Sequence, residues 1–197
     1  MVIHGFQKLT LLDYPGKVAC TLFSGGCNFR CPFCQNGNLV QHPEWEPVIP
    51  EEEIFAVLEK RRGVLDGVCV TGGEPTLDPD LERFVTKIKE LGYLVKLDTN
   101  GYRPEILKKL VEEKKIDYVA MDIKNAPSRY GETAGVKKID VMRINESVEF
   151  LKSGVVDYEF RTTLCKELHE GKRSKRSESG FPGQNGTSCR ITGNRIM

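Results

Sequence analysis

The sequence lacks long apolar runs: no stretch approaches the ~20 consecutive apolar residues that a membrane-spanning helix needs. Residues 1–4 do not have the character of a signal peptide. There is also no large charge of one sign, because the net charge is only +1, and no basic surface typical of nucleic-acid binding is evident. These absences predict a soluble, cytoplasmic protein that binds neither membranes nor nucleic acid.

The composition is that of an ordinary globular domain. The chain has 197 residues, of which 39% are hydrophobic and 29% are charged, which excludes a disordered or collagen-like protein. Residues 171–197 hold six Lys or Arg and one Glu, so residues 1–170 keep 29 − 6 = 23 basic and 28 − 1 = 27 acidic residues, a net charge of −4. A mildly acidic body is therefore followed by a basic tail.

The cysteines are unevenly distributed. Seven is an odd number for a chain without an export signal, which disfavours a disulfide framework. Cys27, Cys31 and Cys34 lie within eight residues, whereas the other four are scattered. Clustered thiols in a cytoplasmic protein indicate metal binding or catalysis.

Short β-rich runs alternate with amphipathic helical patterns. Strands are predicted at residues 18–23, 68–70, 93–97, 118–121 and 155–162, and helices begin at residues 51, 78, 104 and 141. The middle strands start ~25 residues apart, which is typical of β-α units with parallel strands. A complete eight-stranded barrel needs ~250 residues, so we expect an α/β fold, either a partial (β/α) barrel of about five parallel strands or a doubly wound open sheet.

Polar, charged and glycine residues follow each predicted strand. They occupy residues 24–27, 71–75, 98–101, 122–124 and 161–163. In both candidate folds, ligands bind at the carboxyl ends of the strands. We therefore expect these five loops to form one site.

The spacing Cys27-x3-Cys31-x2-Cys34 suits a cubane iron–sulfur cluster, whose irons usually take four cysteine ligands. With three cysteines, one iron stays open to another ligand. A zinc site with His42 as the fourth ligand is an alternative, although the usual paired spacing is missing. Buried cysteines without any metal are the third possibility.

The cysteine triplet, with Phe33 directly before Cys34, resembles the signature of the radical S-adenosylmethionine (SAM) superfamily. Residues 71–75, Thr-Gly-Gly-Glu-Pro, resemble its second motif. The resemblance extends over residues 1–165 to glycyl-radical-enzyme activating enzymes, of the type that activates anaerobic ribonucleoside-triphosphate reductase. Residues 12–17 and 121–124 carry this closer similarity, whereas Gln35 departs from it, since many activating enzymes have His there.

The resemblance implies that Cys27, Cys31 and Cys34 bind a [4Fe-4S] cluster and that SAM takes the open iron. One electron, from a flavodoxin- or ferredoxin-type donor, then cleaves SAM to methionine and a 5′-deoxyadenosyl radical, chemistry that belongs to the cofactor. The radical abstracts a Cα hydrogen from one glycine of a partner glycyl-radical enzyme.

The resemblance also assigns residues of the second and third loops to SAM. Gly72 and Gly73 let the backbone approach the ligand closely, and Glu74 supplies a carboxylate for its ammonium. Asp98 and Thr99 hold the methionine end or an accompanying monovalent cation. The plain alternative for these residues is a strand-to-helix turn with its caps.

The remaining predicted SAM contacts come from the other loops. Asp122, together with Asp98 and Thr99, holds the methionine end of SAM or the monovalent cation, and Asn100 lies nearby. Lys124 pairs with the SAM carboxylate, and Arg161 faces SAM or a substrate backbone. Phe33 lies along the adenine. Each has a structural alternative: Lys124 as a solvated surface lysine, and Phe33 as packing over the cluster.

Two rival functions remain open at this point. One is a radical SAM enzyme with a small-molecule substrate, such as a deazapurine synthase. The other is an iron–sulfur electron carrier without catalysis of its own, against which the Gly-Gly-Glu turn argues because a carrier needs no SAM pocket.

The resemblance ends before the basic tail, residues 171–197. This segment holds five glycines and four serines and shows no helical or alternating period, so its burial cannot offset an ordering entropy of roughly 1–2 kcal/mol per residue. A basic arm for an acidic partner is one interpretation. We expect instead a frameshifted or truncated, poorly packed end with no sixth strand, an exposed sheet edge at residues 156–160 and weakened activity.

Overall fold

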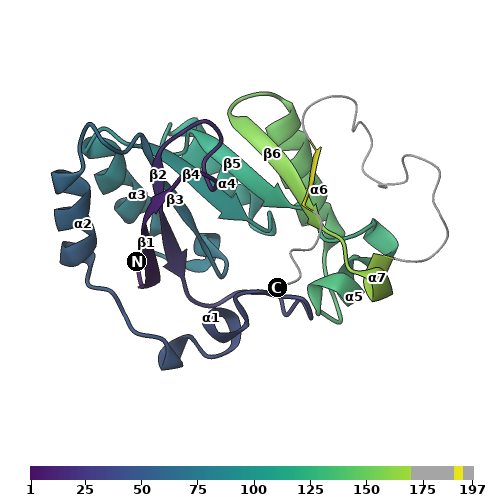
Figure 1. The fold of residues 1–197 in the computed structure, drawn as a ribbon. Helices are drawn as coiled ribbons and strands as arrows, with labels where there is room; N and C mark the ends of the chain where they lie inside the picture. Colours follow the sequence, from purple (N-terminus) through teal and green to yellow (C-terminus); the bar gives the residue numbers. More distant parts are fainter. Residues whose placement is uncertain (170–188, 193–197) are drawn as a thin grey trace.

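The computed structural model describes residues 1–169 and 189–192, which form one seven-stranded sheet with helices against it (Figure 1). The strands are β1 (Ile3–Thr10), β2 (Ala19–Ser24), β3 (Gly67–Gly72), β4 (Leu94–Thr99), β5 (Tyr118–Asp122), β6 (Asp157–Thr163) and β7 (Cys189–Thr192). The helices are α1 (Gly37–Gln41), α2 (Glu51–Lys60), α3 (Leu81–Glu90), α4 (Pro104–Glu112), α5 (Tyr130–Ala134), α6 (Val141–Lys152) and α7 (Lys166–His169). None of the helices in this described part is long and apolar enough to cross a membrane.

The strands lie side by side in chain order, from β1 to β7. β1 is antiparallel to β2, and every later pair is parallel. In the pair β2–β3, Ala19 lies opposite Gly67 and Ser24 opposite Gly72, so the two strands end level with each other. This order confirms the predicted α/β fold, a partial (β/α) barrel.

The helices cover one face of the sheet and form the main core. Alternate strand residues contribute to it, for example Leu22, Val70 and Leu97, all of which are fully buried. Phe84 of α3 and Leu107 of α4 pack into the same cluster. The period of two along the strands therefore places the apolar residues on the helix-covered face.

The opposite face of the sheet carries a second, much smaller apolar cluster. Tyr14, Ala19 and Cys69 form it, and Leu94 and Tyr118 pack against it. Tyr14 lies in the loop between β1 and β2, and its ring centroid is 5.8 Å from that of Tyr118. We call this side of the sheet the site face, because Thr71 and Asp98, which line the cavity described below, lie on the same side of their strands as Cys69 and Leu94.

All five predicted strands are present as β2 to β6, displaced by at most two residues at either end. The four predicted helices are α2, α3, α4 and α6. α3 begins at Leu81, three residues after the predicted start at residue 78. The carboxylate of Asp78 accepts hydrogen bonds from the backbone N–H groups of Asp80 and Val2.

β1 was not predicted, because its sequence does not alternate. Only its first and last residues, Ile3 and Thr10, are buried. Its pairing with β2 is also interrupted twice, between Ile3 and Gly5 and between Gln7 and Thr10. An edge strand of this kind leaves no periodic signal in the sequence.

The prediction that no sixth parallel strand follows is wrong. β7 pairs with β6 in parallel, from Phe160 opposite Cys189 to Thr163 opposite Thr192. The edge of β6 has unpaired backbone groups that a short extended segment can satisfy, and residues 191–192 are β-formers. The prediction used the composition of the whole tail, and therefore it did not detect the four residues of this short strand. Of the predicted exposed edge at residues 156–160, β7 covers only Phe160, because the described pairing begins there. The prediction of a poorly packed end concerns residues 170–188 and 193–197, which lie outside the described residues.

Candidate functional site

A cavity of about 600 Å³ opens at the carboxyl ends of the parallel strands. All thirteen residues predicted for the site line it: Cys27, Cys31, Phe33, Cys34, Gly72, Gly73, Glu74, Asp98, Thr99, Asn100, Asp122, Lys124 and Arg161. Further lining residues were given no role from the sequence: Asp13, Phe29, Gln35, Asn36, Val40, Thr71 and Thr163. The five loops therefore do converge on one site.

The cysteine loop is held by contacts with three other segments. The backbone N–H of Gly26 donates to Leu39 O at 2.7 Å, and that of Arg30 donates to Ala134 O at 2.8 Å. Asn36 Nδ2 donates to Gly72 O at 3.0 Å. These bonds fix the loop against the turn after β3 and against α5.

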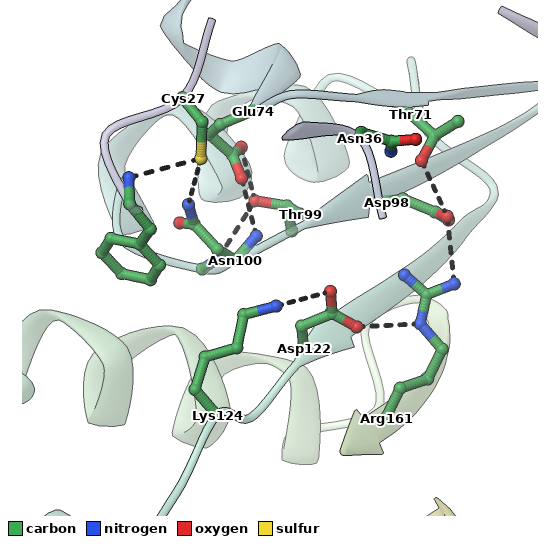
Figure 2. A network of polar contacts seen from close by, with 12 residues as sticks. Cys27, Asn36, Thr71, Glu74, Asp98, Thr99, Asn100, Asp122, Lys124 and Arg161 are labelled. Atoms are coloured by element: carbon green, nitrogen blue, oxygen red, sulfur yellow. Dashed lines mark hydrogen bonds and ion pairs between the residues drawn. The ribbon is translucent and has the colours of Figure 1, made fainter. Parts of the chain in front are cut away.

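Two N–H groups donate to the sulfur of Cys27. The backbone N–H of Phe29 lies 3.3 Å from Sγ, and Asn100 Nδ2 lies 3.7 Å from it (Figure 2). Cys31 is also partly buried, whereas Cys34 is exposed. Burial raises the pKa of Cys27 to about 11 and raises that of Cys31. Metal binding to these thiols would therefore release protons.

Other cysteines lie away from this loop. Cys20 is buried in the main core and Cys69 in the small cluster of the site face. Burial raises the pKa of each thiol to about 12. Both cysteines therefore act as small buried hydrophobic residues.

The donor set fits a cubane cluster better than a single metal ion. Among the described residues, no three Cys, His, Asp or Glu side chains converge on one ion position. The ring of His42 is stacked on Trp45 with centroids 3.7 Å apart, so it does not complete a zinc site with the thiols. A cubane gives each cysteine its own iron. Within the part of the chain that the structure describes, the buried Nδ2 of Asn28 in this loop has no hydrogen-bond partner, so it can donate to a group bound at the loop.

Gly72 and Gly73 allow the turn after β3 to touch the loop after β2. Gly72 has φ +108°, and a Cβ on Gly73 would lie 1.9 Å from Gly26 O. The backbone N–H of Gly73 donates to Ser24 O at 2.8 Å. The sequence suggested that glycine is needed here for close approach to SAM. In the structure, the contact that leaves no room for a side chain at Gly73 is instead with Gly26, in the loop after β2.

Glu74 joins the ends of β3 and β4. Its side chain is buried, and its Oε1 accepts hydrogen bonds from the backbone and hydroxyl of Thr76 and, at 2.8 Å, from Thr99 Oγ1. Its Oε2 accepts from the backbone N–H of Asn100 at 2.7 Å. Burial raises the pKa of Glu74, and these donors oppose that shift. The carboxylate is therefore fixed in position by the protein itself.

A chain of charges crosses the ends of β4, β5 and β6 (Figure 2). Arg161 donates from Nη1 to Asp98 and from Nε to Asp122, both at 3.0 Å. Lys124 Nζ donates to the other oxygen of Asp122 at 3.0 Å. Burial raises the pKa of Asp122, but Lys124 and Arg161 outweigh it and lower the pKa to about 2. The Asp122 carboxylate is thus charged at neutral pH, and the ion pairs hold both carboxylates in place.

Lys124 is held in place through its backbone by the segment after β6. Its carbonyl oxygen lies 3.0 Å from Nε2 of His169. Asn125, the next residue, donates from Nδ2 to Leu168 O at 3.1 Å. The sequence gave no sign of this support, because His169 has no partner pattern along the chain.

A parallel half-barrel with a three-cysteine loop and a Gly-Gly-Glu turn at its strand ends defines a class of iron–sulfur enzymes that use SAM. The chain belongs to the radical SAM superfamily, since the family model of that description matches residues 21–165. Membership implies a [4Fe-4S] cluster and SAM as the cofactors.

Three curated relatives are similar over different parts of the chain. A Methanocaldococcus jannaschii protein, named as a candidate glycyl-radical enzyme activating enzyme, is 34% identical over 85% of this chain and 70% of its own. The 7-carboxy-7-deazaguanine synthase of Koribacter versatilis is 28% identical over 72% of this chain and 59% of its own. The pyruvate formate-lyase-activating enzyme of Staphylococcus aureus is 34% identical over 50% of this chain and 41% of its own.

Solved structures share the fold at low sequence identity. The structure of anSMEcpe with bound AdoMet and the Cp18Cys peptide has a TM-score of 0.54 and 19% identity, and the match covers 73% of this chain and 42% of that one. The chain is therefore shorter than the proteins it resembles, and such a likeness concerns the fold alone.

Proposed function

We propose that the protein is a radical SAM activating enzyme that abstracts a Cα hydrogen from one glycine of a partner glycyl-radical enzyme, such as an anaerobic ribonucleotide reductase. The observation that carries the proposal is the cavity, in which the cysteine loop, the Gly-Gly-Glu turn and the charged strand ends meet. The relative named as a candidate activating enzyme, which is matched over 85% of this chain, supports the choice of partner.

In this proposal, Cys27, Cys31 and Cys34 hold the cluster. The bound cluster supplies the single electron that splits SAM into methionine and the 5′-deoxyadenosyl radical. Hydrogen bonds to a cluster sulfur tune its reduction potential, and the N–H groups of Phe29 and Asn100 already donate to Cys27.

The other residues bind SAM and orient it. Glu74 offers its carboxylate to the ammonium group, and Lys124 offers its ammonium to the carboxylate of SAM. Asp98, Asp122 and Arg161 hold the methionine end through the charge chain. Each of these groups already has a fixed protein partner, so little reorganisation accompanies binding.

Phe33, Thr99, Asn100 and the two glycines complete the proposed binding site. Phe33 lies along the adenine. Thr99 and Asn100 hold Glu74 in place, while Gly72 and Gly73 let the two loops close around the ligand. The partner glycine then gives its hydrogen to the 5′-deoxyadenosyl radical, forming 5′-deoxyadenosine and leaving the glycyl radical.

The electron donor is proposed to be a flavodoxin- or ferredoxin-type protein in an anaerobic cytoplasm. Cys34 and Arg30 are exposed on the cysteine loop. A donor can therefore approach the cluster from the solvent side of this loop.

The decisive experiment follows the glycine hydrogen. The reconstituted protein is mixed under reducing, anaerobic conditions with SAM and an anaerobic ribonucleotide reductase whose glycines carry deuterium at Cα. We expect deuterium in 5′-deoxyadenosine and a glycyl radical signal in electron paramagnetic resonance. SAM cleavage without deuterium transfer from this partner, or from a pyruvate formate-lyase labelled in the same way, would contradict the proposal.

A small-molecule substrate is the second candidate, supported by the match to 7-carboxy-7-deazaguanine synthase over 72% of this chain. It shares the cluster, SAM and the cleavage step, but it needs no protein partner. Formation of a deazapurine product, with no deuterium transfer from glycine, would favour it.

A further inference from the structure

Lys96 is a buried lysine on the site face that neither sequence motif includes. Its side chain is only 1% exposed, and its ammonium pairs with Oδ1 of Asp98. The two residues are separated by one position on β4, so their side chains lie on the same face of the sheet. A lysine that is almost fully buried is retained only when it is paired.

The neighbouring strands leave room for this lysine. Lys96 lies opposite Cys69 of β3 and Tyr118 of β5, and Asp98 lies opposite Ala120. Because Ala120 has no side chain beyond Cβ, the long side chain of Lys96 can reach along the site face to the level of Asp98.

The carboxylate oxygens of the charge chain are already covered by cations. On Asp98, Oδ1 meets Lys96, while Oδ2 meets Arg161 at 3.0 Å and the hydroxyl of Thr71 at 3.1 Å. On Asp122, Oδ1 meets Arg161 and Oδ2 meets Lys124. Each of the four oxygens therefore contacts a positively charged side chain.

This arrangement bears on the monovalent cation expected beside Asp98, Thr99 and Asp122. Three positive side chains already face these two carboxylates. The hydroxyl of Thr99 is engaged as well, since it donates to Glu74 and accepts from Gly101 N at 3.1 Å. A metal ion here would add a fourth positive charge and would have to displace Lys96 from Oδ1 of Asp98.

We propose that Lys96 is a built-in cation: its ammonium occupies the cation position at Asp98, and the site holds the methionine end of SAM without a monovalent metal ion. Lys96 is thus a positioning residue that acts through Asp98. The part that concerns SAM rests on the proposed function, whereas the part that concerns the metal ion does not.

The first test needs no SAM. Sodium ions are titrated into the anaerobically reconstituted protein, and the sodium NMR line width is followed. We expect no saturable site in the wild type. Lys96→Gln should create one, because it frees Oδ1 of Asp98 and adds an amide oxygen. A saturable sodium site in the wild-type protein would overturn the proposal if the substitution Asp98→Asn removes that site. This holds whatever result the Lys96 variants give.

The second test measures SAM affinity with sodium, potassium or tetramethylammonium as the only monovalent cation. The wild-type Kd should change less than about twofold among the three salts. Lys96→Gln should bind at least about tenfold more weakly in tetramethylammonium and recover most of that loss in sodium or potassium. A wild type that loses tenfold or more of its affinity without a metal cation would overturn the proposal, as would a Lys96→Gln variant with unchanged affinity in every salt.

Two further variants distinguish a positioning role of Lys96 from a merely structural role. Lys96→Arg keeps the positive charge and should stay insensitive to the cation, which a merely structural role for the lysine would not predict. Lys108→Gln, on a half-buried lysine of α4 that pairs with Glu146 outside the cavity, should match the wild type in both tests. If the wild type binds no SAM in any salt, the proposed function fails, while the sodium titration still decides on Lys96.

Discussion

Lys96 and Leu97 are neighbours in the sequence and lie on opposite faces of β4. Leu97 belongs to the helix-covered core, where it is fully buried among other apolar side chains. Lys96 is almost as deeply buried, but on the site face, where it is bonded to Asp98. The same strand therefore supports two environments, one governed by packing and the other by individual polar contacts.

The two faces differ in how replaceable their residues are. On the helix-covered face, any apolar side chain of suitable size restores most of the packing. On the site face, each oxygen of Asp98 and Asp122 has a named partner, and the loss of one partner leaves a charge uncompensated. Substitutions should accordingly change stability on one face and chemistry on the other.

The largest expected effect is on the cluster. Cys31→Ala should reduce the iron content of the reconstituted protein from about four per chain to almost none, because the remaining cysteines leave a second iron without a ligand. The unfolding free energy of the metal-free protein should change by less than about 1 kcal/mol, since Cys31 is only partly buried. Iron analysis and urea unfolding measure the two quantities.

Cys69→Ala is the matched control for the cluster, because Cys69 is a buried cysteine of β3 that lies outside the cysteine loop. It should keep the full iron content. Stoichiometric zinc without iron in protein purified anaerobically would contradict the assignment of the loop to an iron–sulfur cluster.

The next effect in size concerns the helix-covered face. Leu97→Ala should lower the unfolding free energy by about 2–5 kcal/mol, through lost burial and the cavity that remains. Leu97→Met, which nearly conserves volume, should cost less than about 1.5 kcal/mol. Urea unfolding at constant temperature measures both. Equal losses for the two variants would mean that packing does not dominate on this face.

A smaller effect is expected where the two site loops touch. A side chain at Gly73 would meet the backbone at Gly26 O, so Gly73→Ala should lower the unfolding free energy of the metal-free protein by about 1–3 kcal/mol. Gly37→Ala meets nothing within 4 Å and should leave stability within about 0.5 kcal/mol of the wild type. A neutral Gly73→Ala would show that the loops separate easily and that the glycine serves only the ligand.

The helix-covered face could be predicted from the sequence because its signals are local and repeated. Val68 and Val70, or Ile88 in α3, recur at the period of their own element, and glycines mark the ends of the helices. β1 and β7 escaped prediction for the opposite reason, since each is an edge strand whose pairing depends on the neighbouring strand rather than on a pattern of its own.

The site face was predicted in part. Residues at the carboxyl ends of strands, such as Asp98 and Asp122, could be located because parallel strands end at one rim. Lys96 lies two positions before Asp98, so the two side chains share a face of the strand. Lys96 could have been predicted as a site residue if this whole face of the strand had been considered. The bond between His169 and Lys124 joins segments far apart in the chain, and no sequence period reports such a contact.

The smallest expected effect is the pH dependence that the site face contributes. Burial alone would raise the pKa of Asp122, but Lys124 and Arg161 lower it from 3.8 to about 2. Between these values the unfolded chain binds the proton and the folded protein does not. The stabilisation is therefore fully present above about pH 4 and is lost as the pH falls towards 2. Because the side chain is 34% exposed, solvent screening reduces the contribution to about 1 kcal/mol.

Asp122→Asn should remove this part of the acid sensitivity, so that its unfolding free energy falls less steeply than that of the wild type between about pH 4 and pH 2. Outside the residues that line the cavity, hydrogen bonds from Arg83 and Lys87 lower the pKa of Glu51 to about 2. Glu51→Gln should likewise make the unfolding free energy fall less steeply over this pH range, while leaving SAM affinity unchanged. Asp122→Asn should weaken SAM binding as well. Urea unfolding of the metal-free protein across this range, paired with SAM titration of the reconstituted protein at neutral pH, measures both effects. If the unfolding free energy of Asp122→Asn falls as steeply with acid as that of the wild type, Lys124 and Arg161 do not hold the Asp122 carboxylate in solution. The distinction between the two faces would then rest on the cysteine loop alone.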